Sequence, residues 1–115
     1  MVVEDEPAAR QATQRFLEFC GFEVETAATA NEALSKSSQF RPQVVVCDCK
    51  LGDSNDGIDV ARQIQDQFGS AVIFVTAWAF KDIREQFHGI DVTDCLRKPV
   101  QLGRLAEVIG GNGAS

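Results

Sequence analysis

The chain has 115 residues, a length that suits one domain with its own core and is too short for two. Hydrophobic residues make up 44% and charged residues 24%, a composition typical of a folded globular domain rather than a disordered one. The net charge of −6 disfavours nucleic acid phosphates and anionic membrane surfaces, so we expect no direct nucleic acid binding and no membrane binding. The sequence has neither an apolar run of about 18 residues nor a secretory leader pattern, which predicts a cytoplasmic location.

The first part of the chain predicts a strand, a helix and a second strand. Residues 1–3 are apolar, and so short a segment is expected to continue a strand that begins upstream. Pro7 suits a first helical turn, and the acidic residues before it favour the positive end of the helix dipole. The helix that follows has an apolar face of Ala9, Ala12, Phe16, Leu17 and Cys20, and Gly21 ends it. Residues 22–27 alternate between apolar and polar side chains, which predicts an edge strand.

A second helix and a buried strand come next. Thr29 and Glu32 form a predicted capping box that opens a helix with an apolar face of Ala30, Ala33 and Leu34. Residues 44–50 read VVVCDCK, an apolar run that a single acidic side chain, Asp48, interrupts. Such a run indicates a strand buried on both faces, with Asp48 at its carboxyl end. In open α/β sheets that edge is where ligands bind, so Asp48 is the candidate carboxylate nucleophile for a phosphoryl group.

The second half of the chain continues the alternation. A turn-rich loop, residues 52–57, precedes a helix with Val60, Ala61, Ile64 and Phe68 that Gly69 ends. Residues 71–75 form an apolar strand ending at Thr76, and a fourth helix carries Phe80, Ile83 and Phe87. Residues 92–96 form a less regular strand before Arg97, Lys98 and Pro99, and the last helix presents Leu102, Leu105, Ala106 and Ile109. We predict one domain over residues 1–109 and a flexible tail over 110–115.

Five alternations of strand and helix with short connections predict a parallel sheet covered on both faces. The strand ends then gather Glu4, Asp5, Asp48, Thr76 and Lys98 at one edge. Three carboxylates in one crevice repel one another, and a hard cation such as Mg²⁺ relieves that repulsion. Together with the Lys98 ammonium, the metal would neutralise a phosphoryl group during its transfer to Asp48, while the Thr76 hydroxyl donates to it and the small Ala77 leaves it room.

These motifs together resemble the receiver domain of two-component response regulators. The motifs are VVEDEP at the start, D-x-x-L-G from Asp48 with Gly57 closing the loop, VTA at Thr76 and L-R-K-P at Lys98, and they cover nearly the whole chain. The resemblance implies a flavodoxin-like fold with strand order 2-1-3-4-5. It implies phosphorylation of Asp48 by a sensor histidine kinase or a histidine phosphotransfer protein, and an output domain or a homodimer that uses the face of helix four, strand five and helix five.

The resemblance also implies the metal ligands and the switch residues. Mg²⁺ (or Mn²⁺) would be held by Glu4, Asp5, Asp48 and the backbone carbonyl of Lys50. The conserved lysine of the family maps to Lys98, its switch hydroxyl to Thr76, and a cis peptide bond to the one before Pro99.

Two positions depart from the family pattern. Cys95 stands where the family usually has an aromatic residue that swings inward with the switch hydroxyl. The loop after Asp48, LGDSNDG, has Gly52 where a proline is common and is one residue longer than the commonest form.

The remaining notable residues have plainer interpretations as well. Trp78 is interpreted either as an exposed aromatic of no consequence or as a gate that shields the acyl phosphate or docks a partner. The four cysteines, Cys20, Cys47, Cys49 and Cys95, are interpreted as free thiols that pack as small hydrophobic side chains, with a redox role for Cys47 and Cys49 left open. The only histidine, His88, is interpreted as structural or solvated.

Alternative functions stay open at this point. The chain could be a receiver-like interaction module that works without phosphorylation, an interpretation that Cys95 leaves open. The presence of the full residue set argues against it: Glu4, Asp5, Asp48, Thr76 and Lys98. A phosphatase with an aspartyl nucleophile usually has a second Asp two residues later, and Lys50 stands there instead. A flavin carrier is the weakest alternative, because the first loop offers carboxylates where a phosphate cradle is needed.

Overall fold

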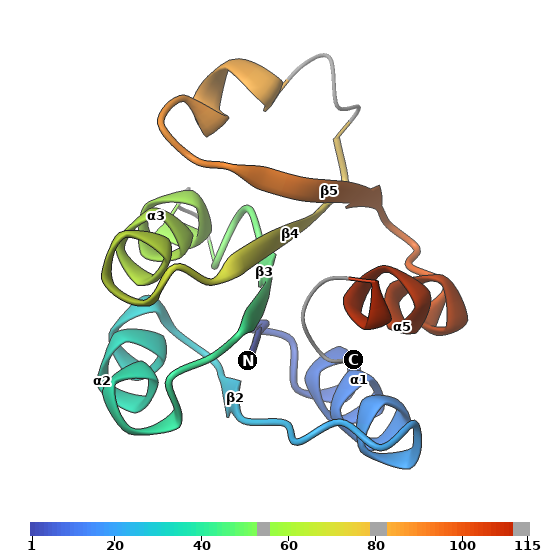
Figure 1. Cartoon of the computed structure of the whole chain (residues 1–115). Coiled ribbons are helices and arrows are strands. Elements are labelled where there is room, and N and C mark those ends of the chain that lie inside the picture. Colours follow the sequence, from blue (N-terminus) through green and yellow to red (C-terminus); the bar gives the residue numbers. More distant parts are fainter. Residues whose placement is uncertain (53–55, 79–82, 112–115) are drawn as a thin grey trace.

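The computed structural model describes residues 1–52, 56–78 and 83–111, in which strands and helices alternate (Figure 1). The strands are β1 (Val2–Val3), β2 (Thr26–Ala27), β3 (Val44–Asp48), β4 (Ala71–Thr76) and β5 (Val92–Arg97). The helices are α1 (Pro7–Phe19), α2 (Ala30–Phe40), α3 (Asp56–Phe68), the 3-10 helix η1 (Arg84–Phe87) and α5 (Leu102–Gly110). All pairings are parallel and the order is β2-β1-β3-β4-β5, so the predicted flavodoxin-like fold is confirmed. None of the described helices is long and apolar enough to cross a bilayer.

The sheet is buried on both faces because its central strands are apolar at every position before their ends. Val45, Cys47 and Phe74 pack on the face that α2 and α3 cover, and the alternate residues Val46 and Val75 pack on the face that α1 and α5 cover (Figure 1). Each face therefore has its own hydrophobic cluster. This arrangement leaves the carboxyl edge of the sheet as the place where polar side chains gather.

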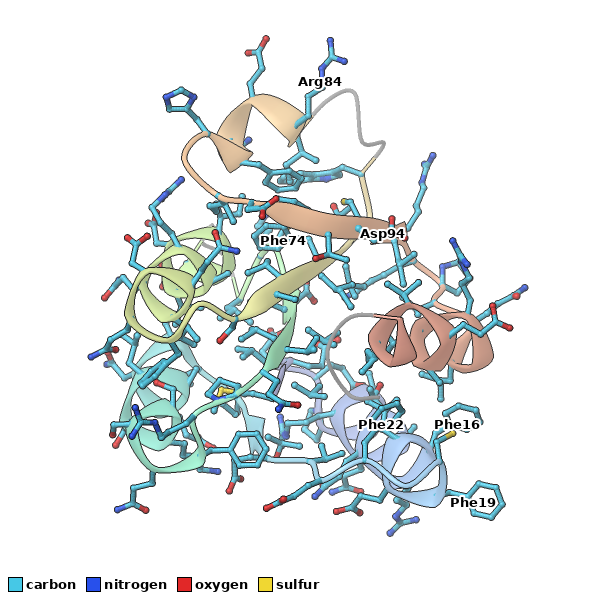
Figure 2. All side chains as sticks on the ribbon, in the orientation of Figure 1. Phe16, Phe19, Phe22, Phe74, Arg84 and Asp94 are labelled. Carbon is cyan, nitrogen blue, oxygen red and sulfur yellow. The ribbon has the colours of Figure 1, made fainter. Side chains whose placement is uncertain are left out.

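The two ends of α1 follow the predicted signals. The Glu6 side chain accepts hydrogen bonds from the backbone N–H groups of Ala8 and Ala9 and caps α1, which begins at Pro7. Gly21 follows α1 with a left-handed φ of 98°. The side chain at the end of α1, Phe19, points away from the domain and is 89% exposed (Figure 2).

Two predicted elements differ in extent. The second strand was expected over residues 22–27, but β2 contains only Thr26 and Ala27, because β1 offers only two partners, Val2 and Val3. The loop after Asp48 was expected to reach Gly57, whereas α3 begins at Asp56 and includes that glycine in its first turn.

The fourth predicted helix lies partly outside the described residues, which exclude Phe80. Its other two apolar residues, Ile83 and Phe87, are buried, and η1 is a single 3-10 turn. The Phe87 ring stacks on Phe74 with centroids 4.5 Å apart, which joins η1 to β4. At the C-terminus α5 includes Gly110, and residues 112–115 of the predicted tail lie outside the described residues.

Candidate functional site

Strand register brings the polar residues of four strand ends together. Val2 pairs with Val46, so Glu4 follows β1 at the level of Asp48 in β3. Asp48 pairs with Val75, and Thr76 is the next residue of β4. The Lys98 N–H donates to the Thr76 carbonyl at 2.8 Å, which continues the β4–β5 pairing to the lysine. Each residue is thus placed by a ladder of backbone hydrogen bonds rather than by loop conformation.

Three carboxylates form an acidic cluster, defined here as Glu4, Asp5 and Asp48. One oxygen from each lies within 4.8 Å of the others. Backbone N–H groups orient them: Gly52 donates to Asp5 at 3.0 Å and Lys50 donates to Asp48 at 3.3 Å. The side chains of Asp48 and Glu4 are only 9% and 12% exposed, whereas Asp5 is exposed, so the cluster is open to water on the Asp5 side.

Lys98 is the cation that faces this cluster. Its Nζ lies 2.5 Å from Oδ2 of Asp48 and 3.5 Å from Oε1 of Glu4. Partial burial alone would lower the pKa of Lys98, but its hydrogen bond to Asp48 and the charges of both carboxylates outweigh burial and raise it. The ammonium therefore stays charged beside Asp48.

The pKa values of Glu4 and Asp5 shift in opposite directions. Burial raises the pKa of Glu4, and the negative charge of Asp48 adds to the rise. Partial burial would also raise the pKa of Asp5, but hydrogen bonds from the Glu4 carboxyl and the Gly52 N–H outweigh it and lower the pKa. The pKa of Glu4 is therefore the higher of the two.

The donor set suits a hard divalent cation. Three carboxylates against one ammonium leave two negative charges uncompensated in a partly buried crevice. Mg²⁺ and Mn²⁺ prefer oxygen ligands and tolerate several waters, which this open acidic cluster would allow. The backbone carbonyl of Lys50 stays a predicted further ligand.

Thr76 is buried next to the cluster, with its hydroxyl turned to another partner. Its Oγ1 accepts a hydrogen bond from the Trp78 N–H at 3.0 Å. Among the described contacts the hydroxyl makes no hydrogen bond to Asp48. Ala77 is exposed at the edge of the site, and the peptide bond between Lys98 and Pro99 is cis.

The side chains of Lys50 and Trp78 contact each other above this edge. The Lys50 ammonium lies 5.5 Å from the centroid of the Trp78 ring, which is 40% exposed. The sequence analysis named Lys50 for its backbone carbonyl and for its place two residues after Asp48, and it missed this contact. A signal was available, since each residue stands two positions after a candidate residue at the end of a neighbouring strand.

The cysteines are free among the described residues, as the sequence predicts. Cys95 is half-buried in β5 and packs against the hydrophobic residues on the α2 and α3 face, and its role as the switch position stays a prediction. Burial raises the pKa of Cys95 to about 11 and that of Cys49 to about 12, and it raises the pKa of Cys47 well above its usual value. These thiols are therefore protonated at neutral pH.

Two supporting residues could not be identified as such from the sequence. A Cβ built on Gly57 would lie 1.7 Å from the backbone oxygen of Asp48, so only glycine lets α3 approach the strand end this closely. Arg10 donates to the backbone carbonyl of Glu4 at 3.0 Å and to that of Asp5 at 3.4 Å. Both residues fix the backbone that carries the acidic cluster.

The fold and this site define a receiver-type domain, and the comparison with known families agrees. The model of the response regulator receiver domain matches residues 1–110, so the chain belongs to this family, which works in two-component systems. Response regulator MprA from Mycolicibacterium vanbaalenii is 35% identical over 107 residues, which cover 91% of this chain and 46% of that protein. Response regulator MprA from Mycobacterium bovis is 34% identical with the same coverage. The chain thus spans less than half the length of these relatives.

Solved structures show the same likeness. The CheY-like response regulator receiver domain protein from Methanospirillum hungatei is 31% identical, with a TM-score of 0.86 over 96% of this chain and 88% of that one. A response regulator receiver domain protein from Clostridium thermocellum is also 31% identical, with a TM-score of 0.81 over 96% of this chain and 90% of that one.

Proposed function

We propose that this receiver domain is a phosphoacceptor in which Asp48 takes a phosphoryl group from a phosphohistidine of a partner. The observation that carries the proposal is the contact of Lys98 with Asp48 inside the acidic cluster. A carboxylate nucleophile, a fixed cation and a set of oxygen ligands for Mg²⁺ are what phosphoryl transfer requires of a protein. The family match supports the same role.

The proposed step forms one bond and breaks one. An oxygen of Asp48 forms the new bond to phosphorus as the bond to the imidazole nitrogen of the donor breaks, and the electron pair of the broken bond stays on that nitrogen. Lys98 stabilises the negative charge on the phosphoryl oxygens. Mg²⁺ bound by Glu4, Asp5, Asp48 and the Lys50 carbonyl would neutralise the remaining charge; Mn²⁺ could replace it.

The proposed switch begins at Thr76. Its hydroxyl would donate to a phosphoryl oxygen, and Ala77 is small enough to leave space for the group. Trp78, held over Lys50, would limit the access of water to the acyl phosphate. Phosphorylation would then shift the domain towards a conformation that binds a partner differently.

The proposed partners are a sensor histidine kinase or a histidine phosphotransfer protein, in the cytoplasm. An output domain or a second copy of the chain would bind the face formed by η1, β5 and α5.

Apart from phosphoryl transfer to itself and its own dephosphorylation, we propose no enzymatic activity. Lys50 stands where an aspartyl phosphatase would need a second acid, and its ammonium lies over the Trp78 ring. The half-buried Cys95 favours a second candidate, a module that binds partners without phosphorylation.

The experiment that tests the proposal is intact mass measurement after incubation with acetyl phosphate and Mg²⁺. We expect the native chain to gain the mass of one phosphoryl group and the Asp48→Asn variant to gain none. Asp66→Asn, which changes an exposed carboxylate of α3, is the matched control and should gain the group as the native chain does. If the native chain stays unmodified at every Mg²⁺ concentration, the phosphorylation-independent module is the better account.

A further inference from the structure

A cavity of about 590 Å³ adjoins the acidic cluster on the face of the sheet that α1 and α5 cover. Its floor is formed by Val2, Val46 and Val75, and its walls come from the first half of α1 and from the segment 98–105. A volume of this size lies in the range of small-molecule sites, roughly 300 to 1,000 Å³.

The sequence of α1 explains why the space is unfilled. Helices α1 and α5 lie side by side on this face (Figure 1), and the second half of α1 fills its part of the interface with Phe16 and the buried Leu17. The first half presents only small side chains to the cavity, those of Ala9, Ala12 and Thr13. No long apolar side chain therefore reaches across to Val100 and Leu102 on the opposite wall.

One end of the cavity is acidic because of strand alternation. Val2 and Val46 face α1 and α5, and residues two positions later in each strand face the same way. Those residues are Glu4 and Asp48, and both line the cavity. The charged groups in the wall are three carboxylates, on Glu4, Glu6 and Asp48, against the single ammonium of Lys98.

We propose that this cavity binds a small organic cation with an apolar body, such as an aryl or alkyl amidinium or ammonium ion. The apolar body would lie between Ala9 and Val100, and the cationic head would donate hydrogen bonds to the Glu4 carboxylate. Pairing with a partly buried carboxylate makes such hydrogen bonds about twice as strong as neutral ones. An anionic ligand of the same shape would meet the excess negative charge and bind poorly.

Benzamidine is a suitable probe, because benzamide and benzoate have nearly the same shape and differ in charge. The three compounds are titrated into the unphosphorylated chain in metal-free buffer, and binding is followed by amide chemical shifts. We expect saturable benzamidine binding about tenfold tighter than that of benzamide, with shifts at Ala9, Val100 and Leu102, and no saturable binding of benzoate. Equal affinities for the three compounds, or shifts confined to other surfaces, would overturn the proposal.

Two variants block the cavity from opposite walls. Ala9→Leu extends a side chain into it from α1, and Val100→Phe does so from the segment before α5. Each should weaken benzamidine binding about tenfold or more, whereas Ala8→Leu, which changes an exposed neighbour on the same helix turn, should leave it unchanged. If both folded blocking variants bind benzamidine as the native chain does, the cavity is not the site. The readout needs neither phosphodonor nor Mg²⁺, so its failure is distinguishable from failure of the phosphoacceptor role.

Discussion

Gly57 gives a sharp test of how closely α3 packs against the strand that ends at Asp48. In an ordinary helix interior, replacing glycine by alanine stabilises the fold by up to about 1 kcal/mol. At Gly57 the new Cβ would lie 1.7 Å from the Asp48 backbone oxygen, roughly half of an ordinary contact distance, and the clashing atom belongs to the backbone. Overpacking of this kind costs about 3 kcal/mol, so we expect Gly57→Ala to lower the free energy of unfolding by about 2 kcal/mol net.

The assay is urea denaturation of Gly57→Ala beside Gly103→Ala. Gly103 is also helical, in α5, and a Cβ there would meet nothing within 4 Å. The control should therefore gain stability, by at most about 1 kcal/mol, where Gly57→Ala loses it. Equal stabilisation by both substitutions would refute the close approach of α3 to Asp48.

Three further outcomes follow from the site. Glu4→Gln should raise the free energy of unfolding at pH 7 in metal-free buffer. The pKa of Glu4 is raised in the folded state above its ordinary value of 4.5, so the native chain loses stability as the pH rises from 4.5 through the raised pKa. Gln carries no titrating proton and avoids this loss. The gain should disappear well below pH 4.5, and the same variant should bind Mg²⁺ about tenfold more weakly in calorimetry. Trp78→Ala should shorten the lifetime of the acyl phosphate about threefold, since a cation–π contact such as that with Lys50 contributes about 0.5 to 1 kcal/mol; an unchanged decay in mass measurements would remove Trp78 as a gate. A colorimetric thiol reagent at pH 8 should modify the exposed Cys20 within minutes and react slowly with the buried Cys47 and Cys49. Rapid reaction of more than two of the four thiols would contradict that burial.

The sequence was most informative where a single physical requirement decides the outcome. A strand buried on both faces must be apolar, so residues 44–47 identified the central strand and Asp48 its end. Parallel strands end at one edge, so the proximity of Glu4, Asp48 and Lys98 could be expected from strand order alone.

The features that could not be predicted depend on partners elsewhere in the chain. Alternation over residues 22–27 indicated a longer strand, but the length of β2 is set by the two residues of β1. Thr29 caps α2 as expected through the Glu32 N–H, yet the Glu32 carboxylate pairs with Lys36 at 3.0 Å instead of completing a capping box. Both outcomes result from tertiary or side-chain competition that a local pattern does not contain.

The most direct test of the central claim is to locate the phosphoryl group chemically. The native chain is phosphorylated with acetyl phosphate and Mg²⁺ and reduced with borohydride, which converts an acyl phosphate to an alcohol, and its peptides are mapped by mass spectrometry. Our account predicts that residue 48 becomes homoserine and that every other aspartate stays unchanged. Homoserine at another position, with Asp48 intact, would contradict it.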